Sequence, residues 1–205
     1  MNITMKAQNK LFTIIILLSL IFLSCGEKKA PVKKPKEVKQ AVKILSDVIV
    51  DKDLGISYQV PLNWELMSAE LSERYVARLN TEKFDGNFVV YNPTAFYFNS
   101  KISGLLRVGS IAESENSQGM VLTVDNYIKL YKKFNPVKII KQEKINTGII
   151  TITQLVIEKS NLISLKNIFL NKKSKIIQFD FSLQQKDYEK EKEFISASLK
   201  SIKLL

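Results

Sequence analysis

Few side chains in this sequence of 205 residues are suited to nucleophilic catalysis or metal binding. Histidine is absent, and Cys25 is the only cysteine. That composition excludes Ser-His-Asp and Cys-His catalytic machinery, the usual His/Cys ligand sets of zinc sites, and an intrachain disulfide. The sequence also has no glycine-rich phosphate loop, no nucleotide motif and no Ser-Lys arrangement in a recognisable setting. We therefore expect a protein that is not an enzyme and binds no cofactor or metal.

Glu113 and Glu115 form a carboxylate pair two residues apart, in the polar segment 113–119, ESENSQG. Two carboxylates at that spacing are able to bind a cation, but the spacing is not specific, because calcium sites need further oxygen ligands at defined positions. A hydrated loop is the better interpretation of this segment.

The formal net charge of +11 is concentrated near the N-terminus. Residues 1–24 contribute +2, and residues 25–45 contribute +5 from seven lysines against two glutamates. The chain from residue 46 onward has 22 basic and 18 acidic side chains and so carries only +4. A body this mildly basic argues against nucleic acid as its main partner.

The first 25 residues have the pattern of an export signal. Two lysines precede an apolar run of 13 residues, 11–23, which is short of the roughly 20 residues that span a bilayer. The run ends in FLSC, residues 22–25, which resembles the lipobox of bacterial lipoprotein signal peptides. The resemblance implies cleavage after Ser24, attachment of diacylglycerol to the Cys25 sulfur, and usually acylation of the new amino terminus. An ordinary signal peptide that ends by chance in a cysteine is the alternative.

We divide the chain into a signal peptide, residues 1–24, a tether, residues 25–48, and a single domain, residues 49–205. The tether is rich in lysine, so it cannot bury enough apolar surface to offset its ordering entropy. Its last part, 37–48, also fits the start of a helix. Two or three acyl chains on Cys25 would hold the protein durably on a membrane. We expect it in the bacterial cell envelope, at the outer membrane or facing the periplasm rather than the cytoplasm.

From residue 51 the hydrophobic pattern becomes regular. Alternating apolar residues and short apolar runs predict strands at 56–60, 88–91, 95–98, 105–111, 137–145, 149–158, 162–170 and 175–183. Helical spacing predicts helices at 68–79, from the N-cap Thr123 to Phe134, and at 185–200. Residues 75–80 also fit a strand, and Asn92-Pro93 is expected to separate two strands. Short connections in the second half favour an antiparallel meander, so the predicted fold is α+β, an antiparallel β-sheet flanked by α-helices.

Two segments of the domain resemble the PsbP-like superfamily. Residues 55–64, GISYQVPLNW, look like its opening strand and Pro-x-x-Trp turn, and residues 198–202, SLKSI, look like its closing helix. The resemblance implies a PsbP-like α/β/α sandwich over most of residues 51–205. Members share a fold more than a function, and many are non-catalytic assembly or binding proteins. We therefore expect an adaptor or assembly factor that binds another envelope component, or alternatively a lipoprotein that holds a small ligand or lipid in a cleft between sheet and helices.

Two groups of lysines and one group of aromatic residues are candidates for binding. The lysines are a stripe at helical spacing, Lys129, Lys132 and Lys133, and a basic turn, Lys172, Lys173 and Lys175. Either group is suited to an acidic protein or an anionic lipid, and the alternative is that both are merely solvated. The aromatic residues would line a ligand groove, with packing in the core as the alternative: Phe84, Phe88, Tyr91, Phe96, Tyr97 and Phe98.

Overall fold

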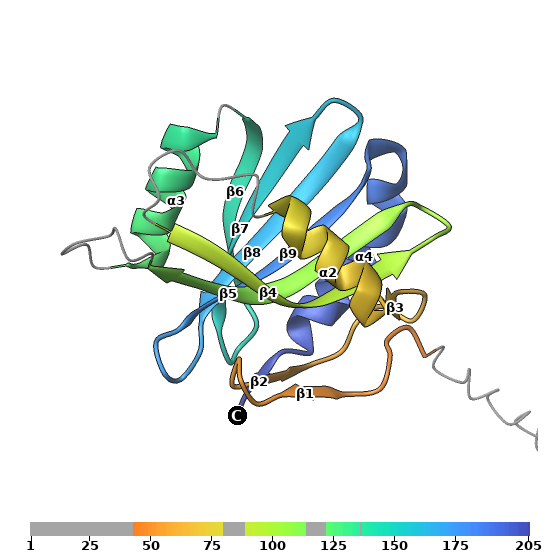
Figure 1. Ribbon diagram of the computed structural model, residues 1–205, viewed down its shortest axis with the longest axis horizontal. Helices are drawn as coiled ribbons and strands as arrows, with labels where there is room; N and C mark the ends of the chain where they lie inside the picture. Colours follow the sequence, from red (N-terminus) through yellow and green to blue (C-terminus); the bar gives the residue numbers. More distant parts are fainter. Residues whose placement is uncertain (1–42, 80–88, 114–121, 136) are drawn as a thin grey trace, which may run out of the picture. The chain divides into compact units, whose positions relative to one another are not determined.

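The computed structural model describes residues 43–79, 89–113, 122–135 and 137–205, all within the unit Val42–Leu205. Along the chain (Figure 1) these residues form β1 (Ile49–Asp51), β2 (Ile56–Tyr58), β3 (Glu65–Leu66), α2 (Ala69–Leu79), β4 (Val89–Asn99), β5 (Gly104–Glu113), α3 (Val124–Phe134), β6 (Lys138–Asn146), β7 (Thr151–Lys159), β8 (Leu162–Leu170), β9 (Ile176–Gln184), α4 (Gln185–Lys200) and β10 (Lys203–Leu204). The predictions for the signal peptide, Cys25 and most of the tether fall on residues 1–42, outside the described residues.

A seven-stranded antiparallel sheet, in the order β3-β4-β5-β9-β8-β7-β6, forms the centre of the domain. Its strands β6 to β9 follow one another along the chain as hairpins, so the predicted meander is confirmed. A smaller sheet, in the order β1-β2-β10, pairs the beginning of the domain with the end of the chain. Together with α2, α3 and α4, the two sheets confirm the predicted α+β fold.

One face of the large sheet packs against α4 and the small sheet. The residues of β9 that alternate toward this face, from Ile177 to Leu183, are fully buried. α4 contributes Ile195 and Leu199, which lie on one side of the helix because they are four residues apart. The alternation predicted for the last strand and the predicted helix bounds, 185–200, are both confirmed.

The opposite face is covered by α3. This helix begins after Thr123, whose side-chain oxygen accepts a hydrogen bond from the Asn126 backbone N–H at 3.1 Å, as an N-cap residue does. Its buried residues Tyr127, Ile128 and Tyr131 form a second apolar cluster with side chains from β4, β5, β7, β8 and β9. Both faces of the large sheet are therefore buried over much of their area.

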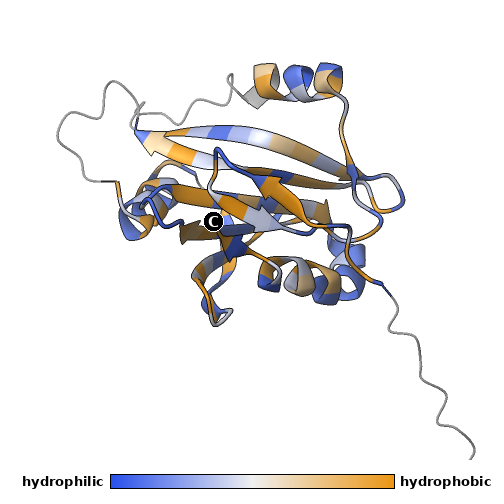
Figure 2. Ribbon diagram, turned by 90° about the horizontal axis from the view of Figure 1, so that it is seen from below, coloured by the Kyte–Doolittle hydropathy of each residue, from blue (hydrophilic) through white to orange (hydrophobic). Residues whose placement is uncertain are grey.

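α2 lies against β4. It confirms the helix predicted for 68–79, and the alternative strand over 75–80 is absent from the described part of that range, 75–79. The ring centroids of Tyr75 and Phe96 are 6.1 Å apart, so an aromatic contact joins the two elements. Figure 2 shows α2 and α4 on opposite sides of the large sheet.

The prediction that Asn92-Pro93 separates two strands is wrong, because both residues lie within β4. The register between β4 and β5 shifts between Pro93 and Ala95, which marks a β-bulge. Proline is tolerated because β3 pairs only with the last part of β4, so the strand is an edge at Pro93 and needs no ladder hydrogen bond there. The opposing residue is Gly109, where an added Cβ would lie 2.3 Å from the Asn92 carbonyl oxygen.

The last residues assigned to the tether, 43–48, make contacts within the domain. Leu45 forms an isolated antiparallel bridge with Pro61, and the Ser46 N–H donates to the Val60 carbonyl oxygen at 2.8 Å. Residues 43–48 are not helical, so the helix start predicted for 37–48 is wrong over this part. Residues 43–48 are extended because their backbone N–H and C=O groups form hydrogen bonds with the chain that follows β2. The local sequence does not reveal these distant partners.

Candidate functional site

The predicted lysine stripe lies on the side of α3 that faces away from its buried residues. Lys129, Lys132 and Lys133 are all exposed. The Lys132 Nζ donates to Oε1 of Gln142 on β6 at 2.7 Å, and the Lys133 Nζ lies 5.1 Å from the centroid of the Phe134 ring. Two of the three lysines thus have contacts within the domain, and a role in binding a partner stays a prediction.

The basic turn, Lys172, Lys173 and Lys175, joins β8 to β9, and all three lysines are exposed. Asn171 organises the turn, because its side-chain oxygen accepts hydrogen bonds from the backbone N–H groups of Lys173 and Lys175, each at 2.9 Å. The Asn171 amide nitrogen donates to the Leu54 carbonyl oxygen at 2.8 Å. The turn is therefore held against the loop between β1 and β2.

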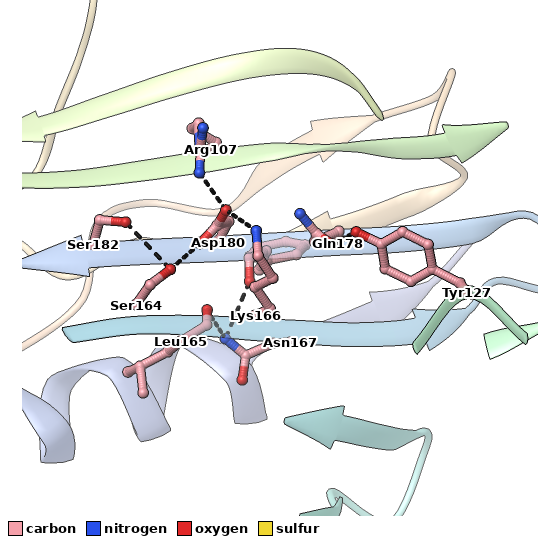
Figure 3. Close-up of polar contacts among 10 residues, drawn as sticks. Arg107, Tyr127, Ser164, Leu165, Lys166, Asn167, Gln178, Asp180 and Ser182 are labelled. Atoms are coloured by element: carbon pink, nitrogen blue, oxygen red, sulfur yellow. Dashed lines mark hydrogen bonds and ion pairs between the residues drawn. The ribbon is translucent and has the colours of Figure 1, made fainter. Parts of the chain in front are cut away.

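A buried ionic cluster (Figure 3) lies on the face of the large sheet that α3 covers and that Phe96, the contact of α2, also faces. At its centre is Asp180 of β9, whose side chain is 0% exposed. Lys166 Nζ donates to Asp180 Oδ2 at 2.7 Å, the Arg107 guanidinium forms an ion pair with the same oxygen, and Ser164 Oγ donates to Oδ1 at 2.8 Å. Both carboxylate oxygens therefore accept hydrogen bonds from neighbouring strands.

The register of the sheet brings the charged residues of this cluster together. Arg107 on β5 and Lys166 on β8 are the two Cα partners of Asp180, one on each side. Directly opposite residues in antiparallel strands have Cβ atoms about 4.5–5.5 Å apart, which long basic side chains easily bridge. Two cations therefore flank one buried carboxylate.

Asp180 is ionised throughout the neutral range. Burial by itself would raise its pKa, but the charges of Arg107 and Lys166 and the hydrogen bonds from Lys166 and Ser164 outweigh burial and lower the pKa to about 2. Such a group is a poor general acid or base near neutral pH, because efficient proton-transfer groups have pKa values near the working pH. The arrangement suits holding β5, β9 and β8 in register rather than moving protons.

Tyrosines from α3 and β4 lie close to the ionic cluster. The Tyr127 hydroxyl donates to Oε1 of Gln178 at 2.9 Å, and the Lys166 Nζ lies 5.2 Å from the centroid of the Tyr131 ring. Burial raises the pKa values of Tyr91 and Tyr127, and the negative charge of Asp180 raises them further. The phenols of Tyr91 and Tyr127 therefore stay neutral. Tyr127 adds a hydrogen bond, and Tyr131 adds a cation–π contact, to the packing of α3.

A depression of about 380 Å³, open to solvent, lies between α2 and β4. Phe96 is its most buried lining residue at 2% exposed. Because Phe96 is the Cα partner of Arg107, the depression lies next to the ionic cluster on the same face of the sheet. The full lining comes from one side of α2 and the bulged part of β4: Ser72, Glu73, Val76, Ala77, Pro93, Thr94 and Phe96.

The described members of the predicted aromatic groove do not lie on a single surface. Phe84 and Phe88 lie outside the described residues. Phe96 and Tyr97, as neighbours in β4, point to opposite faces of the sheet. Phe96 borders the depression, whereas Tyr97 is in the core and shares a 3.0 Å hydrogen bond with Tyr58. Strand alternation therefore divides the group between a depression and the core.

The predicted carboxylate pair has only one member among the described residues. Glu113 ends β5, where its Oε1 accepts a hydrogen bond from the Leu122 N–H at 3.0 Å, and Glu115 lies outside the described ranges. Among the residues that the structure describes, no three His, Cys, Asp and Glu side chains form a group able to hold a metal ion. No helix in that part of the chain is long and apolar enough to cross a membrane.

The ionic cluster left only a weak signal in the sequence. Gln178, Asp180 and Ser182 alternate with the apolar residues of β9, which indicates a strand with one polar face. Solvent usually covers such a face in an antiparallel sheet. The apolar stripe of α3 was the available hint that a helix covers it instead.

Comparisons with known proteins agree with this architecture. No protein-family model matches the chain, and no curated protein matches it. Among solved structures, the chain is similar to the solution structure of cyanobacterial PsbP (CyanoP) from Synechocystis sp. PCC 6803, with a TM-score of 0.52 and 14% sequence identity. The similarity covers 86% of this chain and 100% of that chain. At this level of identity the likeness concerns the backbone arrangement alone, and we conclude that the domain has the PsbP-like fold.

Proposed function

We propose that this protein is a membrane-anchored lipoprotein of the bacterial cell envelope, whose PsbP-like domain binds another envelope protein as an adaptor or assembly factor. The observation that carries the proposal is the placement of the only cysteine, Cys25, at the end of an export signal and before a lysine-rich segment. The fold adds modest support, because it is compatible with a binding module and does not by itself specify a reaction.

Among the residues that the structure describes, the depression between α2 and β4 offers a surface suited to a protein partner. Its volume of about 380 Å³ is near the lower end of the roughly 300–1,000 Å³ of small-molecule pockets, and it is open rather than enclosed. Open apolar hollows commonly receive one anchoring side chain from a partner protein. Phe98, 38% exposed and two residues beyond Phe96, extends the apolar surface on the same side of β4.

The anchor has a specific chemical signature. Mature protein extracted from the membrane should begin at Cys25 and carry two or three acyl chains, which mass spectrometry of the N-terminal peptide detects. Cys25→Ser should abolish the acyl mass, because no other thiol is present in the chain. A wild-type protein whose Cys25 is unmodified would contradict the anchor, whatever the domain binds.

Site-specific crosslinking in the native cell tests the depression. A photoreactive residue at position 73 should capture a defined protein partner, and Ala77→Lys, which fills the depression with a charged side chain, should reduce that capture about fivefold or more. Glu70→Gln is the matched control, because it makes the same change in net charge on α2 outside the lining residues. Equal capture by the two variants would show that the partner does not insert into the depression.

A second candidate function is the binding of a small apolar ligand or lipid, and the same depression is the observation that favours it. Native mass spectrometry of purified protein should then show a bound small molecule that Ala77→Lys removes and Glu70→Gln retains. A protein that carries no such molecule, yet gives the crosslink at position 73, supports the adaptor function instead.

A further inference from the structure

Exposed apolar side chains gather on the outer face of the small sheet. Val50, in β1, is 56% exposed, and Val48, the residue just before β1, is 62% exposed. Val50, Ser57 and Lys203 are successive Cα partners across β1, β2 and β10. Leu205, 49% exposed, follows Lys203 by two residues and so shares its side of the sheet. We call this surface, Val48, Val50 and Leu205, the outer face.

Lysines border the outer face. Lys52 lies in the loop between β1 and β2, and Lys203 lies on β10; both are exposed. The basic turn, 172–175, is held against the same loop by the hydrogen bond from Asn171 to Leu54. Asp47, the acidic residue next to Val48, forms an ion pair with Lys43 at 2.7 Å. Asp53, which is also exposed, lies next to Lys52 in the loop. Apolar side chains with lysines at their border are typical of surfaces that contact anionic bilayers.

The described chain begins beside the outer face. β1 and the C-terminus lie along the lower edge of the domain in Figure 1, and Figure 2 looks onto that side from below. Seventeen residues, 26–42, separate Cys25 from Lys43. A flexible chain of that length has a root-mean-square end-to-end distance of about 23 Å. An anchor at Cys25 would therefore keep the outer face at a high local concentration near the bilayer.

We infer that the outer face and its lysine border rest on the surface of an anionic bilayer and so fix the orientation of the domain relative to the membrane. The inference rests on the proposed lipid anchor, because three partly exposed side chains and a few lysines bind a bilayer only weakly and reversibly by themselves. A second copy of the chain fits the outer face less well, since two lysine-bordered surfaces would repel one another.

Lysine footprinting on an artificially anchored protein tests this inference without depending on natural acylation. The unacylated mature chain, 25–205, is coupled through its only thiol, Cys25, to maleimide-bearing lipid in phosphatidylglycerol vesicles. A water-soluble amine reagent and mass spectrometry then measure the labelling rate of each lysine. Lys52 and Lys203 should be protected about threefold or more relative to the same chain in solution, whereas Lys129 and Lys133 should label equally in both.

Two substitutions and a second lipid define the controls. Val50→Glu should abolish the protection of Lys52 and Lys203, while Ile140→Glu, which changes a similarly exposed apolar residue on β6, should leave it intact. Far-UV circular dichroism checks that both variants are folded. Vesicles of phosphatidylcholine should give weaker protection, because the lysines then lack an anionic partner.

Equal labelling of all exposed lysines, protection centred on the α3 lysines, or protection that Val50→Glu leaves unchanged would each overturn the inference. Protection that appears only together with a concentration-dependent dimer would assign the outer face to a second copy of the chain and would also overturn it. Because maleimide coupling supplies the anchor, these outcomes do not depend on whether the cell acylates Cys25. Natural acylation is tested separately, by the mass of the N-terminal peptide.

Discussion

Asp180 shows how strongly one side chain depends on its neighbours in this protein. Its carboxylate is fully buried and accepts hydrogen bonds from Lys166, Ser164 and Arg107. Removing one partner of a buried ion pair is costly because the remaining charges stay in a medium that solvates them poorly. The two basic side chains, 17% and 11% exposed, have limited access to water if the carboxylate is lost.

We expect Asp180→Asn to lower the free energy of unfolding by about 3–5 kcal/mol, because the substitution keeps the shape of the side chain but leaves two buried cations without their carboxylate. Urea unfolding followed by circular dichroism measures the change. The control is Glu70→Gln, which breaks the exposed Glu70–Arg74 pair and should cost no more than about 0.5 kcal/mol. Similar losses in the two variants would show that the ionic cluster contributes little.

The same residue predicts a loss of stability in acid. The pKa of Asp180 is lowered from 3.8 to about 2 in the folded chain, so as the pH falls the unfolded chain takes up the proton first. The contribution of this group, about 2 kcal/mol, is fully present above about pH 4 and disappears as the pH falls toward 2. Urea unfolding at a series of pH values should show this decline in the wild type. A variant carrying Asp180→Asn should decline less steeply over the same pH range.

At the scale of elements, the bulge in β4 shows where local signals and sheet geometry disagree. Asn92-Pro93 has the composition of a strand breaker, but β4 continues through it because the strand is a sheet edge at this point. The space for the bulge comes from the opposing strand, where Gly109 presents no side chain. The bulge lies opposite Gly109 only because of the register between β4 and β5. That register cannot be predicted from the sequence of either strand alone.

Gly109→Ala should destabilise the domain by about 1–3 kcal/mol, because a Cβ at this position would lie 2.3 Å from the backbone of Asn92 and the β4–β5 pairing would have to shift. Chemical unfolding gives the magnitude. Gly148→Asn is the comparison, since Gly148 has a φ of 85° but no atom within 4 Å of an added Cβ, and asparagine tolerates this conformation at a smaller cost. A larger effect at Gly148 than at Gly109 would contradict the role of the close approach.

At the scale of the whole molecule, β9 ties the two apolar clusters together. Phe181 faces the first cluster, where its ring centroid lies 5.5 Å from that of Trp64, while Ile176 points into the second cluster beneath α3. β9 contributes side chains to both clusters, one cluster on each of its faces. If one cluster loses its packing, β9 is destabilised, and the other cluster loses support as well. The domain, Val42–Leu205, should therefore unfold as one cooperative unit.

Two spectroscopic probes test that cooperativity. Trp64 is the only tryptophan and is 3% exposed, so its fluorescence reports the first cluster, whereas far-UV circular dichroism reports all helices including α3. The two signals should give the same midpoint in urea, and Asp180→Asn should move both midpoints together. Separate midpoints would show that the α3 side unfolds independently of the rest of the domain.

Much of the architecture was predictable because it follows from local patterns. The alternation in residues 175–183, the helical stripe in 185–200 and the N-cap at Thr123 each reflect side chains that must share one face of a single element. The short connections of the second half favoured hairpins, and strands β6 to β9 form them in chain order. These elements predict the α+β class, and the structural similarity to PsbP agrees with the PsbP-like fold that the resemblance of residues 55–64 and 198–202 implies.

The proposal of a membrane-anchored envelope protein also rests on local pattern, namely the export signal and Cys25. The uneven distribution of charge is likewise read directly from the sequence. Only the tertiary structure decided which polar residues are buried. Arg107 and Asp180 are 73 positions apart in the chain, and the register of β5 against β9 places them opposite each other. The depression between α2 and β4 and the outer face beside β1 likewise combine residues from separate elements. The physical reason is that periodicity specifies which side of an element is apolar, whereas strand order and register, set by burial across the whole domain, specify what that side meets.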